Sequence, residues 1–182
     1  MRAPADVRDI VGAEVSLRLD ANGALDLPGA LALAQAVKAL HVDCIEQPFP
    51  RHAWADWVAF RRQARLSVMA DESLVTLQDA DDLLERQACD LFNLRLSKNG
   101  GLLATLALAE KGRQAGMGLQ LGCQVGETAI LSAAGRHLAA HLGDLRYVEG
   151  SYGEMLLQED IGREPVQFGV NGVAAPLTGP GL

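Results

Sequence analysis

The chain contains three short apolar segments that each end in a carboxylate, VSLRLD at residues 15–20, VDCIE at 42–46 and LSVMAD at 66–71. The three carboxylates, Asp20, Glu46 and Asp71, recur at intervals of 26 and 25 residues. One strand and helix of a (β/α)8 barrel take about this many residues, and catalytic groups in such barrels lie at the carboxyl ends of successive strands. The spacing therefore predicts three acidic side chains at one end of a parallel sheet.

These three acids are candidate metal ligands. Carboxylate oxygens suit Mg²⁺, which keeps further positions for water and substrate, and Mn²⁺ is the alternative ion. A single acid at a strand end is commonly a solvated loop residue or a helix N-cap, but three in register are not common. Asn22 and Gln47 follow two of the acids closely and are candidates for orienting the carboxylates from outside. For Asn22, a turn made by the Asn-Gly pair is an equally good interpretation.

The remaining chain repeats the same alternation of short apolar runs and longer amphipathic stretches. We expect strands at roughly 15–20, 42–46, 66–70, 91–96, 117–122 and 145–149. The helices between them are expected at roughly 28–40, 53–64, 76–87, 101–115 and 126–141, with a further helix in 1–14. Strands that alternate with helices indicate a parallel sheet in an α/β fold.

The motifs LRLDANG, CIEQPFP, MADES and FNLRLSKNGG, followed by a closing PGL, resemble the enolase superfamily. The similarity is to the barrel of its muconate-cycloisomerase and mandelate-racemase-like branches, and it runs over nearly the whole chain. The resemblance implies a Mg²⁺ site made by acids on three consecutive barrel strands, which match Asp20, Glu46 and Asp71 here.

The resemblance also implies that the barrel is incomplete. Eight strands and helices typically need ~250 residues, whereas this chain has 182, and Asp20 corresponds to the third strand of the family. We therefore expect about six βα units, without the first two strands and the capping domain. No linker divides the sequence, so a single domain over 1–182 is predicted, with an irregular tail at 169–182.

The general base is where this sequence departs from the family. Relatives carry a lysine five positions before a Gly-Gly pair, and that position is Arg95 here. Arginine stays protonated at neutral pH, so we expect Arg95 to pair with a substrate carboxylate or to stabilise an enolate. Lys98 is a candidate base if the strand ends early, and otherwise a loop lysine at a helix start. The second lysine base of the family lies on a strand that this chain lacks.

Further polar residues are expected near the substrate. In GLQLGCQVGET, Glu127 is a candidate acid or hydrogen-bond partner, although a first-turn helix position is an equal interpretation. Gln124 is a second candidate for substrate binding. Glu149, in YVEGSYG, is expected at a strand end, where it contacts substrate or is simply a solvated or paired acid.

Composition excludes several other classes of protein. The formal net charge of −7 and a pI near 5.0 argue against nucleic-acid binding, which usually needs a basic patch. No apolar stretch reaches the length of a membrane span. Cys44, Cys89 and Cys123 form no metal-binding spacing, and their odd number argues against a disulfide framework. A reducing, cytoplasmic location fits best.

The family resemblance implies Mg²⁺-assisted removal of a proton α to a carboxylate, with stabilisation of the enolate. The product is a racemate or epimer, a cycloisomer or a dehydrated acid, and the sequence does not choose among them. The alternative is an inactive fragment, or one part of a split barrel that needs a complementary chain. We expect the chain alone to lack isomerase activity and to associate as a homo-oligomer or with such a partner.

Overall fold

The structure is a computed structural model, and it describes residues 4–150, 153–162, 166, 173–174 and 177. Most of the tail that was expected to be irregular, including the PGL motif, lies outside the described residues. By its internal contacts the chain divides into two units, unit 1 (Met1–Phe92) and unit 2 (Asn93–Leu182). The expectation of a single domain over 1–182 stays a prediction.

Six strands are present in the described part of the chain, and the six-strand prediction is confirmed. They follow one another in chain order in one sheet, in which the first four strands pair in parallel and so do the last two. The strands are β1 (Leu17–Asp20), β2 (Val42–Glu46), β3 (Ser67–Ala70), β4 (Leu91–Leu94), β5 (Gly118–Leu121) and β6 (Tyr147–Val148). With helices between the strands, the fold is α/β and corresponds to an incomplete (β/α)8-type barrel.

The expected helices are also present, with shorter bounds. They are α1 (Pro4–Val11), α2 (Leu27–Ala36) with the short 3₁₀ helix η1 (Lys38–Leu40), α3 (Trp54–Gln63), α4 (Leu77–Glu85), α6 (Leu102–Gln114) and α7 (Ala129–Leu142). Two four-residue helices were not predicted, α5 (Leu96–Asn99) and α8 (Gly153–Leu156). The first of these has a consequence for the site, because strand β4 ends at Leu94 rather than at Leu96.

Local sequence signals explain where several helices begin and end. Asp26 caps α2 by accepting a hydrogen bond from the Gly29 amide at 2.8 Å, and a proline occupies the first turn. Thr76 and Asp79 form a capping box at the start of α4. After α6, Gly116 adopts φ of +72°, a conformation in which glycine carries no Cβ penalty.

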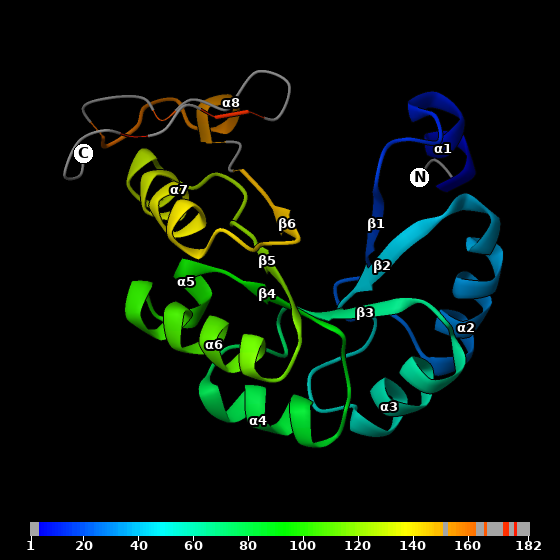
Figure 1. The fold of residues 1–182 in the computed structure, drawn as a ribbon. Coiled ribbons are helices and arrows are strands. Elements are labelled where there is room, and N and C mark those ends of the chain that lie inside the picture. The colour runs from blue at the N-terminus through cyan, green and yellow to red at the C-terminus, as the bar shows by residue number, and fades with distance from the viewer. Residues whose placement is uncertain (1–3, 151–152, 163–165, 167–172, 175–176, 178–182) are drawn as a thin grey trace. The chain divides into compact units, whose positions relative to one another are not determined.

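In unit 1, helices α2 and α3 lie on the outer side of the strands β1 to β3 (Figure 1). An aromatic cluster fills the core, with Phe49 packed edge-on against Trp57 and Phe60 at centroid distances of 6.1 and 5.6 Å. All three side chains are fully buried. The Trp57 indole also donates to the Pro50 carbonyl at 3.2 Å, so this core fixes the loop that follows β2.

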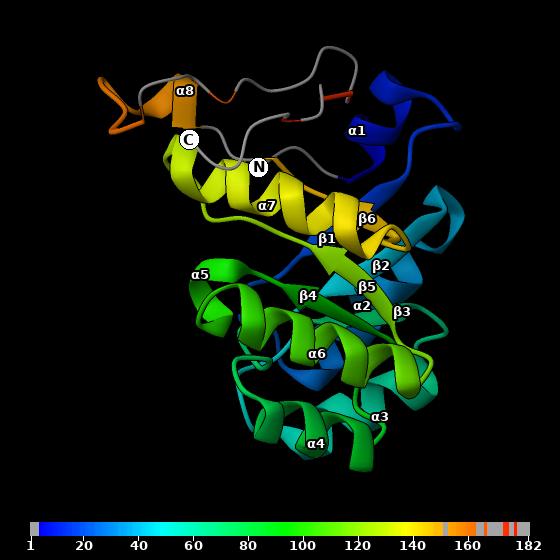
Figure 2. The same cartoon turned by 60° about the vertical axis from the view of Figure 1, so that its left-hand side comes forward.

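In unit 2, helix α6 packs against β5, and α5 contacts both α6 and α7 (Figure 2). Strands β4 and β5 approach closely at Gly122, whose amide donates to the Leu94 carbonyl at 2.8 Å. A Cβ at Gly122 would lie 2.3 Å from Oδ1 of Asn93. Glycine is therefore required where the buried Asn93 side chain crosses to the neighbouring strand.

Candidate functional site

The three predicted metal-ligating acids lie at the carboxyl ends of neighbouring strands in unit 1. Asp20 and Glu46 are the last residues of β1 and β2 and are register partners. Asp71 directly follows β3, two residues beyond Met69, which is the partner of Glu46. Side chains alternate along a strand with a period of two, so the register assigns the three acids to the same face. Glu46 and Asp71 are buried, whereas Asp20 is exposed.

Asn22 lies in the turn that follows Asp20. Its φ is +46° and that of Gly23 is +71°, and the Ala24 amide donates to the Ala21 carbonyl across the turn at 3.0 Å. The Asn22 amide donates to Oδ1 of Asp20 at 2.9 Å. Asn22 is thus the turn-forming residue, and it acts on Asp20 through its backbone.

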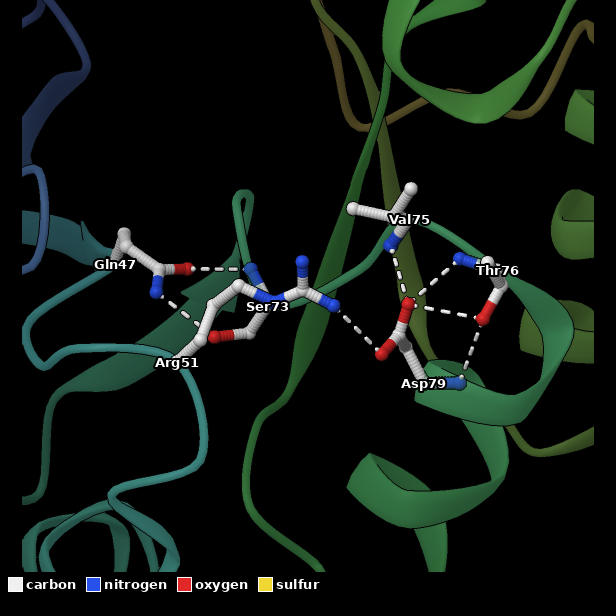
Figure 3. A network of polar contacts seen from close by, with 6 residues as sticks. All are labelled: Gln47, Arg51, Ser73, Val75, Thr76 and Asp79. Atoms are coloured by element: carbon white, nitrogen blue, oxygen red, sulfur yellow. Dashed lines mark hydrogen bonds and ion pairs between the residues drawn. The ribbon is translucent and has the colours of Figure 1, made fainter.

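Gln47 connects the loop after β2 to the loop after β3 (Figure 3). Its buried side-chain oxygen accepts hydrogen bonds from the amides of Asp71 and Ser73, both at 3.1 Å. Its side-chain nitrogen donates to the Ser73 hydroxyl at 2.8 Å and to the Phe49 carbonyl at 2.9 Å. The residue next to Glu46 therefore holds the backbone of Asp71, which supports the orienting role that was predicted for Gln47.

A second polar contact joins the same two loops through Arg51 and Asp79 (Figure 3). Arg51 pairs with Oδ1 of Asp79 at 2.9 Å. The other oxygen of Asp79 accepts from the amides of Val75 and Thr76 at 3.1 and 2.8 Å. Burial alone would raise the pKa of Asp79, but the hydrogen bonds from Thr76 and Val75 and the charge of Arg51 outweigh it and lower the pKa.

The fit of a divalent cation to the three acids is partial. Their chemistry is that of a Mg²⁺ site, and the strand register puts them at adjacent strand ends. However, the described residues contain no group of three His, Cys, Asp or Glu side chains that could hold a metal ion as they stand. Binding at Asp20, Glu46 and Asp71 therefore requires their carboxylates to approach one another.

The candidate base region in unit 2 begins where β4 ends. Arg95 stands one residue beyond the strand as the N-cap of α5, and its amide donates to Oδ1 of Asn99 at 2.8 Å. The strand does end early, which was the condition for Lys98 to approach it. Nζ of Lys98 donates to the Asn93 carbonyl at 2.8 Å. The lysine side chain thus turns back from α5 to the strand.

Glu127 and Cys123 lie near Arg95 in unit 2. Burial raises the pKa of Glu127, while the Gln124 amide, which donates to its carboxylate at 2.7 Å, and the charge of Arg95 act to lower it. Burial, followed by the charges of Glu127 and Glu149, raises the pKa of Cys123 to about 11 despite Arg95. The thiol of Cys123 is therefore protonated at neutral pH and is a poor nucleophile.

The other two predicted substrate contacts have different surroundings. Glu149 directly follows β6, and its carboxylate accepts a hydrogen bond from the buried Gln120 amide group at 3.2 Å. Glu149 thus accepts a side-chain hydrogen bond, and its contact with substrate stays a prediction. Gln124 is exposed, and its backbone is what contacts Glu127.

Four polar residues near the candidate site were not predicted from the sequence. Asn93 and Gln120 are fully buried in the middle of apolar strands, and a polar letter inside FNL and LQL was the available signal. Ser73 and Asp79 are also buried. For Asp79 the signal was the T-x-x-D spacing of a capping box.

In the described part of the chain, no helix is long and apolar enough to cross a membrane. The three cysteines are all free.

The chain matches one family model over residues 1–182, described as enolase C-terminal domain-like. It is 33% identical over 181 residues to a chloromuconate cycloisomerase of Cupriavidus pinatubonensis, covering 100% of this chain and 48% of that protein. It is 32% identical to a hydrophobic dipeptide epimerase of Enterococcus faecalis, covering 94% of this chain and 47% of that protein. The chain spans about half the length of these curated relatives.

Solved structures agree with this similarity. A dipeptide epimerase from Cytophaga hutchinsonii, complexed with Mg and the dipeptide D-Ala-L-Val, matches with a TM-score of 0.86 and 26% identity, covering 95% of this chain and 46% of that chain. A muconate lactonizing enzyme from Pseudomonas fluorescens, complexed with muconolactone, matches with a TM-score of 0.81 and 34% identity. The match covers 89% of this chain and 43% of that chain.

Proposed function

Because the chain belongs to the enolase C-terminal domain-like family, we propose that it serves in Mg²⁺-dependent removal of a proton α to the carboxylate of a small acid. The observation that carries this proposal is the register of Asp20, Glu46 and Asp71 at adjacent strand ends. These residues would hold the ion, with Mn²⁺ as a substitute. A bound divalent cation supplies positive charge where negative charge develops on the substrate.

Each candidate residue of unit 2 has a role that its chemistry supports. Arg95 is a permanent cation and pairs with a substrate carboxylate or stabilises an enolate. Lys98 is the candidate base, since its ammonium reaches the end of β4. Glu127 is the candidate acid, because burial raises its pKa and a carboxyl group can donate a proton in general acid catalysis. Gln124 and Glu149 are proposed to contact substrate.

The substrate class follows from the named relatives. They act as cycloisomerases and dipeptide epimerases, and one solved relative holds Mg and a dipeptide. We propose a small carboxylate as substrate, with racemisation or epimerisation, cycloisomerisation or dehydration as the outcome. The cytoplasmic location remains a prediction.

Exchange of the α-proton in D₂O tests this proposal. The chain is incubated with Mg²⁺ and a library of dipeptides and other small carboxylates, and deuterium incorporation is followed by NMR. Exchange that needs Mg²⁺ and is lost in Glu46→Gln would support the proposal. Exchange that persists in Glu46→Gln, or without a divalent ion, would contradict the assigned site.

A second candidate is that the chain is inactive alone and works only with a complementary segment. The exposed apolar face of α1 and its following loop favours this. Val7, Ile10, Val11 and Val15 are 37%, 67%, 37% and 46% exposed, and α1 has no buried residue. Such a face next to β1, at one end of the strand order, is a natural contact for another segment.

Light scattering coupled to size-exclusion chromatography distinguishes the two candidates. A chain that associates, and that gains α-proton exchange only in the associated state, would support the second. Paired substitutions Val7→Ser and Ile10→Ser should then reduce association. A monomer that exchanges the α-proton by itself would contradict it.

A further inference from the structure

The loop that carries Asp71 is held at both of its ends by side chains. At its start, Gln47 accepts from the amides of Asp71 and Ser73. At its end, Asp79 accepts from the amides of Val75 and Thr76. Between these contacts, the Leu74 amide donates to the Asp71 carbonyl at 2.8 Å.

Both contacts lead back to the loop that carries Glu46. Gln47 is the residue after Glu46, and Arg51 lies in the same loop, which is anchored on the core through the Trp57–Pro50 hydrogen bond. The pair of Arg51 and Asp79 therefore forms a second bridge, parallel to Gln47, between the loops of two candidate metal ligands. The side chain of Asp79 is only 11% exposed, so its carboxylate is committed to these partners.

We propose that Arg51 and Asp79 are positioning residues, which set the place of Asp71 relative to Glu46 by clamping the far end of the 71–76 loop. This inference rests on the proposed metal-binding function. Neither residue is expected to touch the ion or the substrate. Their effect passes through the backbone, as outer contacts of a metal site commonly do.

The chain offers a matched control at the other end of β3. Asp90 also accepts a backbone amide, from Val68 at 2.9 Å, and pairs with an arginine, Arg61, at 2.8 Å. It precedes β4 and bonds the start of β3, so it lies at the amino ends of the strands. Asp90→Asn removes the same kinds of contact as Asp79→Asn without acting on the loop that carries Asp71.

Mn²⁺ titration of the full chain, followed by electron paramagnetic resonance well below the unfolding temperature, tests the inference. Asp79→Asn should weaken Mn²⁺ binding by roughly tenfold, while Asp90→Asn should bind like the wild type. Arg51→Met should weaken binding in the same way, and Arg51→Lys should restore part of it. Since Arg51 is a surface residue, these variants keep the test valid if Asp79→Asn does not fold.

Amide hydrogen exchange supplies a second readout that does not need the ion. Asp79→Asn and Arg51→Met should speed exchange at Val75 and Thr76 and, through the loop, at Asp71. If the wild type binds Mn²⁺ and the variants Asp79→Asn and Arg51→Met bind it with the same affinity, this inference is wrong while the proposed function stands. A wild-type chain that binds no Mn²⁺ would overturn the proposed function and this inference with it.

Discussion

The two ends of strand β3 carry the same kind of contact but differ in what it holds. At the amino end, Asp90 joins Arg61 to the first residues of β3. At the carboxyl end, Asp79 joins Arg51 to the loop that begins with Asp71. In barrels of this kind the carboxyl ends of the strands serve chemistry and the amino ends serve stability.

The difference also appears in burial. Of the two acids, Asp79 is the more buried, since its side chain is 11% exposed and that of Asp90 is 31% exposed. The two arginines are similar, with Arg51 41% exposed and Arg61 34% exposed. The carboxyl end adds Gln47, a buried amide that makes four hydrogen bonds. A buried polar network of this kind is costly unless every member is satisfied. The hydrogen bonds of Gln47 therefore restrain the loop that begins with Asp71.

The largest effect is expected from Gln47→Leu. It leaves the amides of Asp71 and Ser73 buried without their acceptor, so we expect a loss of about 3 kcal/mol in the free energy of unfolding. Gln87 is the control at the amino end, because it is exposed and, like Gln47, has a positive φ. The angle is +53° at Gln87 and +38° at Gln47. Urea unfolding should show Gln87→Leu close to wild type. An equal loss of unfolding free energy in the two variants would show that the effect comes from backbone conformation and not from the hydrogen bonds of Gln47.

The second largest loss of stability is expected in unit 2, from a glycine at the carboxyl end of β5. Gly122→Ala places a methyl group against Asn93 at the carboxyl end of β5, and overpacking of this kind costs about 2 kcal/mol. Gly116 lies before the amino end of β5 with open space around it and φ of +72°. Gly116→Ala should therefore cost only about 1 kcal/mol, the penalty of a left-handed alanine. Thermal unfolding of the two variants measures the difference, and a smaller loss in Gly122→Ala would contradict it.

The smallest effect is a pH dependence that belongs to Asp79. Its pKa is lowered in the folded chain, so the folded state binds this proton less tightly than the unfolded state. The stabilising contribution is therefore full at neutral pH and is lost as the pH falls below about 4, through the lowered pKa of the folded state. For a partly exposed pair we expect less than about 1 kcal/mol.

Unfolding of wild type and Asp79→Asn at pH 7 and pH 3 measures this contribution. The stability difference between them should shrink at the lower pH. A difference that stays constant would show that the charge of Asp79 does not matter.

Much of the fold was predictable because its signals are local and repeated. Apolar runs that end in acids located β1 to β3, and the longer amphipathic stretches between such runs located the main helices. The early end of β4 was not predictable, because the L-R-L pattern continues the strand period. The strand ends early because α5 forms, and the Arg95 amide at the start of this helix donates a hydrogen bond to the Asn99 side chain.

The candidate site was predictable only in part. Acids at strand ends, such as Asp20 and Glu46, can be recognised from their spacing in the sequence. The contacts that hold the loop of Asp71, from Gln47 to Ser73 and from Arg51 to Asp79, join residues that are 26 and 28 positions apart. Such pairs depend on how two loops pack, and no periodicity in one sequence reveals them.

The most direct measurement of the central claim is Mg²⁺ titration calorimetry on Asp71→Asn and Asp90→Asn, one acid from each end of β3. We expect Asp90→Asn to bind Mg²⁺ as the wild type does and Asp71→Asn to lose binding although it remains folded. Wild-type affinity in Asp71→Asn, or equal losses in both variants, would contradict the assignment of the carboxyl end as the metal-binding end.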